Sequence, residues 1–222
     1  MSSNGALSHI NTVLFDLDGT LLDSNELIAE SWLYTIKALT GEELPVEDIY
    51  TTFGEMLIDS MKRLMPGVDA KRARDVYREY QQEIFLDRIK LFDGVKETLE
   101  RLRTAGVKSA LVTSRLRNST EKALAHFNII DLFDAILTAN DTEKHKPDPT
   151  PVFMILDMID SKPEEAMLVG DTKHDIEAGQ AAGVITALVD WSVAIPSEKR
   201  SEEPTPDYIF QTMLDIPLIL DV

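Results

Sequence analysis

Residues 13–20 read VLFDLDGT, a short apolar run followed by two aspartates and a Gly-Thr pair. A short apolar run that ends in a polar turn is typical of a strand buried on both faces. In an extended chain Asp16 and Asp18 project to the same side. Paired carboxylates at a strand end are typical of a catalytic or metal site, although an ordinary polar turn would give the same local pattern. The choice between these readings depends on the other strand ends.

Similar apolar runs recur along the chain, at residues 12–16, 108–113, 134–138, 166–171 and 185–190, with a weaker one at 207–210. Helical patterns alternate with the later runs, at residues 95–106, 118–127, 149–160 and 174–183. For two of these helices the sequence predicts an N-cap, Ser119 or Thr120 in one and Thr150 in the other, with Pro151 in the first turn. Strands that alternate with helices predict an α/β fold with a parallel, doubly wound sheet.

The stretch from residue 22 to 90 breaks this alternation, because it contains helical patterns and no convincing strand. We therefore expect two domains. Residues 1–21 and 91–222 would form the α/β core, and residues 22–90 would form an inserted, all-helical subdomain.

Composition narrows the range of functions. The 222 residues carry a formal net charge of −17, which argues against nucleic acid as a partner because phosphate backbones are bound mainly by Lys and Arg. There is no cysteine, so disulfides, thiolate metal sites and cysteine nucleophiles are excluded. Neither a signal-peptide pattern nor an apolar stretch of about 20 residues is present, which predicts a cytoplasmic protein without a membrane partner.

Polar side chains that could act in catalysis or ligand binding follow four successive strands. Ligands bind beyond the carboxyl ends of parallel strands, so residues at these positions are expected to share one site. They are Asp16 and Asp18 after the first strand, Thr113 and Ser114 after the second, Lys146 in HKPDP beyond the third, and Asp171 and Asp175 in GDTKHD after the fourth. Oxygen ligands without Cys or clustered His suit Mg²⁺. A free carboxylate facing a bound phosphate can attack it, while a second can protonate the leaving oxygen and then activate water.

In order and spacing, DLDGT, the strand end at Thr113, KPDP with Lys146, and GDxxxD at 170–175 resemble the four motifs of the haloacid dehalogenase superfamily. The helical insert after the first motif resembles the type C1 cap of that superfamily. The pattern is most similar to the phosphoglycolate phosphatase group and its inorganic pyrophosphatase branch. The resemblance implies a Rossmann-like core and a Mg²⁺-dependent phosphatase for a small phosphate compound, with an aspartyl-phosphate intermediate.

The resemblance also implies a role for each matching residue. Asp16 would be the nucleophile and Asp18 the general acid and base, and Lys146 would neutralise charge on the nucleophile and phosphate. Thr113 and the backbone of Ser114 would bind phosphoryl oxygens together with Lys146. Mg²⁺ would be held by Asp16, Asp18 and Asp171, with Asp175 supporting the metal site directly or through water. Arg115 and Arg117 are equally consistent with a solvated position and a functional one.

Substrate specificity is expected to lie in the cap, where Gly54 and Glu55 fall at the position of C1-cap specificity residues. A sugar phosphate mutase of the β-phosphoglucomutase type is an alternative function. Such enzymes place basic residues beside this glycine, whereas here no Lys or Arg follows until Lys62. A catalytically idle fold retained for protein binding is a third reading, which would predict a damaged motif, yet all four motifs are intact. The oligomeric state is left open between monomer and homodimer.

Overall fold

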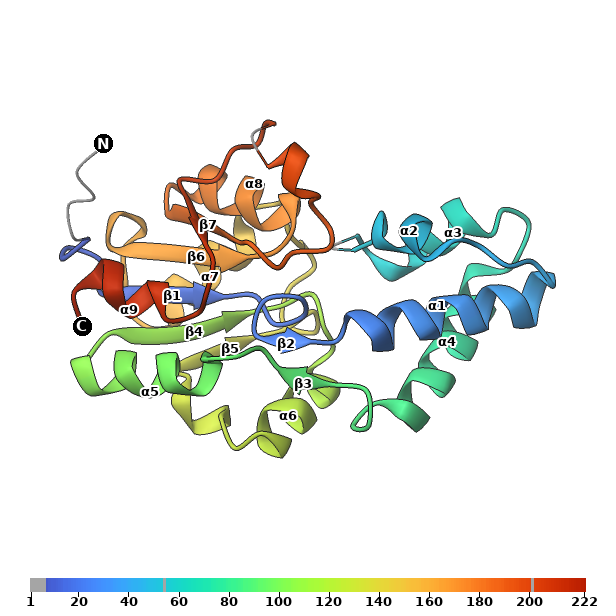
Figure 1. Ribbon diagram of the computed structural model, residues 1–222, viewed down its shortest axis with the longest axis horizontal. Helices are drawn as coiled ribbons and strands as arrows, with labels where there is room; N and C mark the ends of the chain where they lie inside the picture. The colour runs from blue at the N-terminus through green and yellow to red at the C-terminus, as the bar shows by residue number, and fades with distance from the viewer. Residues whose placement is uncertain (1–6, 54, 201) are drawn as a thin grey trace. The chain divides into compact units, whose positions relative to one another are not determined.

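A computed structural model describes residues 7–53, 55–200 and 202–222, and places VLFDLDGT at the centre of a six-stranded parallel sheet. The strand order is β5-β4-β1-β6-β7-β8 (Figure 1). The strands are β1 (Thr12–Phe15), β4 (Lys108–Val112), β5 (Ala135–Leu137), β6 (Ala166–Gly170), β7 (Ile185–Val189) and β8 (Tyr208–Phe210). The predicted α/β class with a parallel, doubly wound sheet is therefore confirmed, and so are all six predicted strands.

The pairing register of the three central strands places their carboxyl ends side by side. Phe15, the last residue of β1, pairs with Leu111 of β4 and with Val169 of β6. Asp16, Thr113 and Asp171 therefore leave the sheet at its carboxyl edge on three neighbouring strands. In each case the polar residue lies just beyond the last strand residue, because the strand ends where the buried apolar run ends.

Helices cover both faces of this sheet. Five follow the strands in the chain: α5 (Val95–Ala105), α6 (Arg117–His126), α7 (Thr150–Met158), α8 (Lys173–Ala182) and α9 (Asp215–Leu220). Three 3₁₀ turns, η1 (Ile130–Leu132), η2 (Pro163–Glu165) and η3 (Ser197–Lys199), lie between them. One face of the sheet, with Leu14, Ala110 and Leu168, packs against Val152 of α7 and Ala178 of α8. On the other face α5 contacts β4 and α9, and Thr98 of α5 donates a hydrogen bond to the Met213 carbonyl.

The predicted helix caps are wrong in two helices. α6 begins at Arg117, and the hydroxyls of Ser119 and Thr120 donate to the Leu116 carbonyl instead of capping free N–H groups. α7 begins at Thr150 itself, after Pro149, with Pro151 in the first turn as predicted. Ser and Thr in a first turn can bond backward to a carbonyl, so their presence alone does not locate the cap.

The chain divides into two compact units. One combines the N-terminal residues up to Leu22 with Leu91–Val222, and the other is Asp23–Lys90. The second unit is built from α1 (Asn25–Thr40), α2 (Val46–Tyr50), α3 (Leu57–Leu64) and α4 (Ala70–Ile84). Its core includes Trp32 and Tyr77, whose ring centroids lie 5.5 Å apart. That this unit is a C1-type cap stays a prediction.

One expectation about residues 22–90 is wrong at the margins of the stretch. Leu22–Asp23 (β2) and Lys90–Leu91 (β3) form a second, two-stranded sheet. Strands of two residues are too short for the alternation of apolar and polar residues by which a strand is recognised in a sequence.

Within the described ranges, no helix combines the length and the apolar character needed to cross a bilayer.

Candidate active site

Three buried carboxylates meet at the carboxyl edge of the sheet. One oxygen each of Asp16, Asp171 and Asp175 lies within 4.8 Å of the others. Asp16 follows β1, Asp171 follows β6, and Asp175 lies in the first turn of α8. The structure therefore brings together residues that are as far as 159 positions apart in the sequence, as the strand-end argument predicted.

Lys146 joins two of these carboxylates. Its Nζ donates to Asp16 Oδ1 at 2.7 Å, to Asp175 Oδ1 at 2.5 Å and to the Val112 carbonyl at 3.0 Å. The ammonium is almost completely buried, so these contacts replace its hydration. Burial by itself would lower the pKa of Lys146, but Asp16 and Asp175 raise it above the usual range, so the ammonium stays charged.

Burial acts on both acids that pair with Lys146, but their pKa values shift in opposite directions. Burial raises the pKa of Asp16 to about 7; the charge of Lys146 opposes this shift, and repulsion from Asp175 adds to it. Burial would also raise the pKa of Asp175, but the Lys146 ammonium and hydrogen bonds from Thr172 lower it. Asp175 is therefore ionised at neutral pH, and both its oxygens are engaged, because Oδ2 accepts from the backbone N and Oγ1 of Thr172 at 3.0 and 2.7 Å.

Asp171 is the least compensated member of the cluster. Burial raises its pKa well above the usual range, and repulsion from Asp175 and Asp16 adds to that shift. Its Oδ1 accepts a long hydrogen bond of 3.4 Å from Thr20, and no cation lies within ion-pair distance among the described residues.

The chain leaves room for Asp171 by placing glycine opposite it. Gly19 has a φ of +80°, and a Cβ there would lie 2.2 Å from Asp171 Oδ2. The "DGT" of the opening stretch thus provides a side-chain-free approach to a buried carboxylate. A cluster of three buried carboxylates with one lysine has excess negative charge and hard oxygen donors, which is the donor set that suits a divalent cation such as Mg²⁺.

Asp18 and Thr113 complete the group of predicted residues. Asp18 Oδ1 accepts a hydrogen bond of 2.7 Å from Arg115 Nη1, and Thr113 Oγ1 accepts one of 3.1 Å from the Arg115 backbone N. Ser114, the residue between, is half-buried. Arg115, which the sequence left undecided, is thus part of the site.

Two further residues, to which the sequence assigned no role, hold Asp171 and its strand end in place. Thr20 is fully buried beside the carboxylate, and Ser192 Oγ donates to the Asp171 carbonyl at 2.5 Å. Arg200 holds the loop that carries Ser192, by an ion pair with Asp190 and a hydrogen bond to the Ile195 carbonyl. Thr20 belongs to the DGT signature and could have been found from it, whereas nothing in the sequence around Ser192 signals its role.

The predicted specificity residues in the helical unit are not tested by this geometry. Gly54 lies outside the described residues. Glu55 is half-buried, and it pairs with Arg63 at 2.9 Å and accepts from Ser60 at 2.6 Å.

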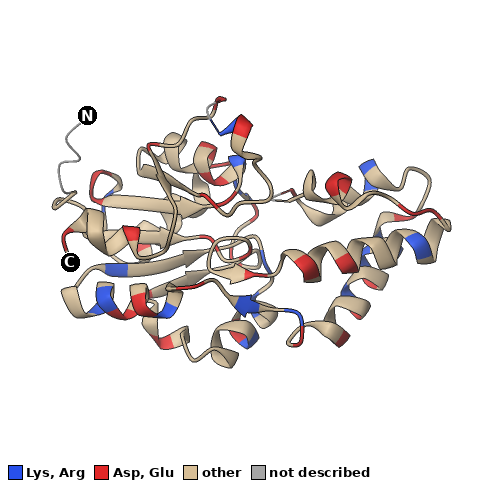
Figure 2. Cartoon of the chain, in the orientation of Figure 1, with Lys and Arg blue, Asp and Glu red and all other residues tan. Residues whose placement is uncertain are grey.

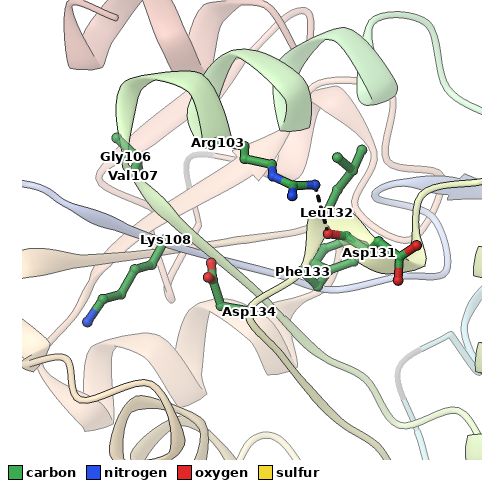
Figure 3. Close-up of a pocket in the computed structure, with 8 residues that line it drawn as sticks. All are labelled: Arg103, Gly106, Val107, Lys108, Asp131, Leu132, Phe133 and Asp134. Atoms are coloured by element: carbon green, nitrogen blue, oxygen red, sulfur yellow. Dashed lines mark hydrogen bonds between the residues drawn. The ribbon is translucent and has the colours of Figure 1, made fainter.

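A separate cavity of about 190 Å³ lies at the opposite, amino edge of the sheet (Figure 3). Three of its polar side chains hold local structure. Arg103 donates to the Asp131 carbonyl, Lys108 donates to the Ile159 and Asp160 carbonyls, and Asp134 accepts from the Ser109 backbone N. The cavity offers no acid, base or metal ligand comparable with those at the carboxyl edge.

Comparison with known proteins agrees with this geometry. The family model described as haloacid dehalogenase-like hydrolase matches residues 13–189. The chain is 36% identical over 214 residues to pyrophosphatase PpaX from Bacillus mycoides, covering 95% of this chain and 97% of that one. A crystal structure described as a predicted phosphoglycolate phosphatase from Haemophilus somnus superposes with a TM-score of 0.83 at 25% identity, covering 95% and 98% of the two chains. A haloacid dehalogenase-like hydrolase from Streptococcus pneumoniae has the same fold, with a TM-score of 0.83 at 24% identity and coverage of 95% and 98%.

Proposed function

Because the chain belongs to the haloacid dehalogenase-like hydrolase family, we propose that it is a Mg²⁺-dependent phosphatase that acts on a small phosphate compound through an aspartyl-phosphate intermediate. The observation that carries the proposal is that Lys146 pairs with both Asp16 and Asp175 at the carboxyl edge of the sheet. Asp18 lies two residues after Asp16 in the sequence. The substrate classes supported by similarity are pyrophosphate, after PpaX, and a phosphoglycolate-type monoester.

Asp16 is the proposed nucleophile. Its carboxylate oxygen attacks phosphorus, the bond from phosphorus to the leaving oxygen breaks, and Asp18 gives that oxygen a proton. Water then attacks the phosphoryl group on Asp16, with Asp18 accepting the water's proton, and phosphate leaves. Lys146 holds Asp16 in position and offsets the negative charge that accumulates around the transferred group.

Mg²⁺ would be held by the carboxylates of Asp16 and Asp171 and by the Asp18 backbone carbonyl. The ion would polarise the phosphoryl oxygens and offset the repulsion within the acidic cluster. Asp175 has both oxygens engaged by Lys146 and Thr172, so we assign it the indirect role of fixing Lys146. Thr113, Ser114 and Lys146 would contact the phosphoryl oxygens.

The test is a screen of pyrophosphate, phosphoglycolate, nucleoside monophosphates and sugar phosphates with Mg²⁺, measured by phosphate release. We expect release from at least one compound, a loss of at least about 10³-fold in Asp16→Asn, and loss of activity in EDTA. Asp131→Asn, which makes the same change at an exposed aspartate of η1, should retain full activity. Activity retained in Asp16→Asn, or unaffected by EDTA, would refute the nucleophile or the metal.

The mutase alternative gains no support from the helical unit. The first basic residues after position 54 are Lys62 and Arg63, and they pair with Asp59 and Glu55 in the same region. Conversion of a hexose 1-phosphate to its 6-phosphate, with no phosphate released from any compound of the screen, would favour a mutase over a phosphatase.

A further inference from the structure

Arg115 is the buried cation closest to the group that the proposed function makes the general acid and base. Its Nη1 donates to Asp18 Oδ1 at 2.7 Å, and its side chain is 8% exposed, against 22% for Asp18. The two residues are 97 positions apart and belong to different strand ends, so the contact is made by the fold. A charge-assisted hydrogen bond of this length is about twice as strong as a neutral one.

The guanidinium is held from several directions. Its Nε donates to Ser119 Oγ at 3.1 Å, and Ser119 Oγ donates in turn to the Leu116 carbonyl at 3.0 Å. The Arg115 carbonyl accepts from the Ala139 backbone N at 3.0 Å. The planar guanidinium therefore links Ser119 in the first turn of α6 to Asp18 in the loop after β1. A lysine ammonium, which is a single nitrogen, could not make both contacts in this geometry.

The same loop also carries the proposed phosphate ligand. The Arg115 backbone N donates to Thr113 Oγ1 at 3.1 Å, so the hydroxyl and the guanidinium are positioned by one short segment after β4. Any shift of this segment would move the phosphate ligand and the partner of Asp18 together. Correct placement of a reacting group matters steeply, since a misplacement of about 1 Å can cost about 10²-fold in rate.

We propose that Arg115 is a positioning residue for proton transfer, which holds the Asp18 carboxylate facing the leaving-group oxygen. The inference rests on the proposed function, because it requires Asp18 to be the acid and base. It assigns a role to a residue outside the four motifs that define the family resemblance. Arg115 acts through Asp18, so its importance depends on how much the leaving group needs a proton.

The test is a series of substituted phenyl phosphates whose leaving groups range from strongly acidic nitrophenols to phenol, assayed with saturating Mg²⁺. We expect Arg115→Ala to lose about 10-fold in kcat/KM with the best leaving group and about 10²- to 10³-fold with the poorest, because only the poor ones need protonation. Asp18→Asn should show the same steepening. Arg115→Lys should recover part of the loss, since it keeps the charge without the fork.

Two controls isolate the effect. Arg117→Ala removes the same charge two residues away, where the side chain is 40% exposed and pairs with Glu121 and Asp141, and should leave the series unchanged. The double variant Arg115→Ala/Asp18→Asn should be no slower than Asp18→Asn alone. If Arg115→Ala does not fold, Ser119→Ala removes the Nε anchor and should steepen the series more mildly.

The outcomes separate the two proposals. A uniform loss across the series in Arg115→Ala, or full additivity with Asp18→Asn, overturns the positioning role and leaves the phosphatase intact. A loss that follows the negative charge of the substrate instead of the acidity of its leaving group would make Arg115 a substrate ligand and also overturn it. An Asp18→Asn variant with wild-type rates across the series refutes the acid and base of the proposed function itself.

Discussion

Asp171 shows how burial and charge act together at a single residue. Asp171 is 1% exposed and has two acidic neighbours, Asp16 and Asp175. Among the described residues, the Thr20 hydroxyl is the only group seen to donate a hydrogen bond to its carboxylate. Burial, with repulsion from these neighbours, raises the pKa of Asp171, so the folded protein favours the protonated form more than a free carboxyl does. A bound cation would reverse that preference.

Replacing Asp171 with Asn should stabilise the metal-free protein. Its pKa is raised in the folded state above the ordinary value of 3.8, so folding takes up a proton and the free energy of unfolding falls as pH rises above about 4. Asn is neutral throughout and escapes this loss. In EDTA the melting temperature of Asp171→Asn should exceed that of the wild type by a margin that grows from pH 4 toward pH 8, by about 2–4 °C for each kcal/mol by which the change relieves the cost of burying the charge and its repulsion by Asp175 and Asp16.

Saturating Mg²⁺ should reverse the order, because the cation stabilises only the protein that binds it. Melting curves measured with and without Mg²⁺ provide the check. A metal-free Asp171→Asn protein that melts below the wild type at pH 8 would show that the carboxylate is compensated by a partner other than a cation.

At the scale of elements, α8 links helix capping to the site. Thr172 accepts from the Asp175 backbone N, and Asp175 accepts from the Thr172 backbone N, a reciprocal capping box at the start of the helix. Gly170 makes this possible, since a Cβ there would lie 2.3 Å from Asp175 Cβ. The same carboxylate that caps α8 holds Lys146, so the start of the helix and the ammonium are positioned together.

Thr172→Ala should therefore reduce both stability and activity. Loss of the cap should lower the free energy of unfolding by about 1 kcal/mol. Loss of the Oγ1 bond to Asp175 should loosen Lys146 and lower kcat/KM several-fold. Urea unfolding and steady-state kinetics measure the two effects, and Thr172→Ser, which keeps the hydroxyl, should be close to wild type in both. Unchanged kinetics in a destabilised Thr172→Ala would confine the capping box to a structural role.

At the scale of the whole molecule, the net charge of −17 opposes an anionic substrate. Acidic residues are spread over the helices of both units (Figure 2). At the site, Lys146 and Arg115 are the cations that pair with Asp16 and Asp18. The long-range field therefore repels an anion, and attraction at the proposed phosphate site would come from Lys146, Arg115 and a bound Mg²⁺.

Raising the ionic strength from about 20 to about 200 mM should raise kcat/KM for an anionic substrate about 2- to 5-fold at saturating Mg²⁺, because salt screens the long-range repulsion more than the buried contacts. kcat should change little. Initial rates with NaCl and with a neutral osmolyte as control separate screening from crowding. A fall in kcat/KM with salt would mean that local cations dominate the approach of the substrate.

Much of the fold and of the site follows from local features of the sequence. Six short apolar runs predict the six strands, because strands buried on both faces need continuous apolar residues. The polar residues that end those runs predict Asp16, Thr113 and Asp171 at one edge, since all parallel strands end there. The caps of α6 and α7 escaped prediction because Ser and Thr can also occupy the first turn of a helix and bond backward to a carbonyl, as Ser119 and Thr120 do. The strands β2 and β3 escaped prediction because two residues are too few to show a strand pattern, and their pairing joins segments remote in sequence.

By itself the sequence determined the α/β class, the order of the strands' polar ends and the identity of the carboxylates and lysine that gather there. The family resemblance also implied that Lys146 faces Asp16, but only the tertiary structure decided the other pairings. Lys146 bridges Asp16 and Asp175, Arg115 holds Asp18, and Ser192 supports Asp171 through its backbone. The reason is physical: residue type and order set what a strand end can offer, but pairing and pKa depend on distances of a few ångströms and on burial. These exist only after segments 21 to 130 residues apart have packed together.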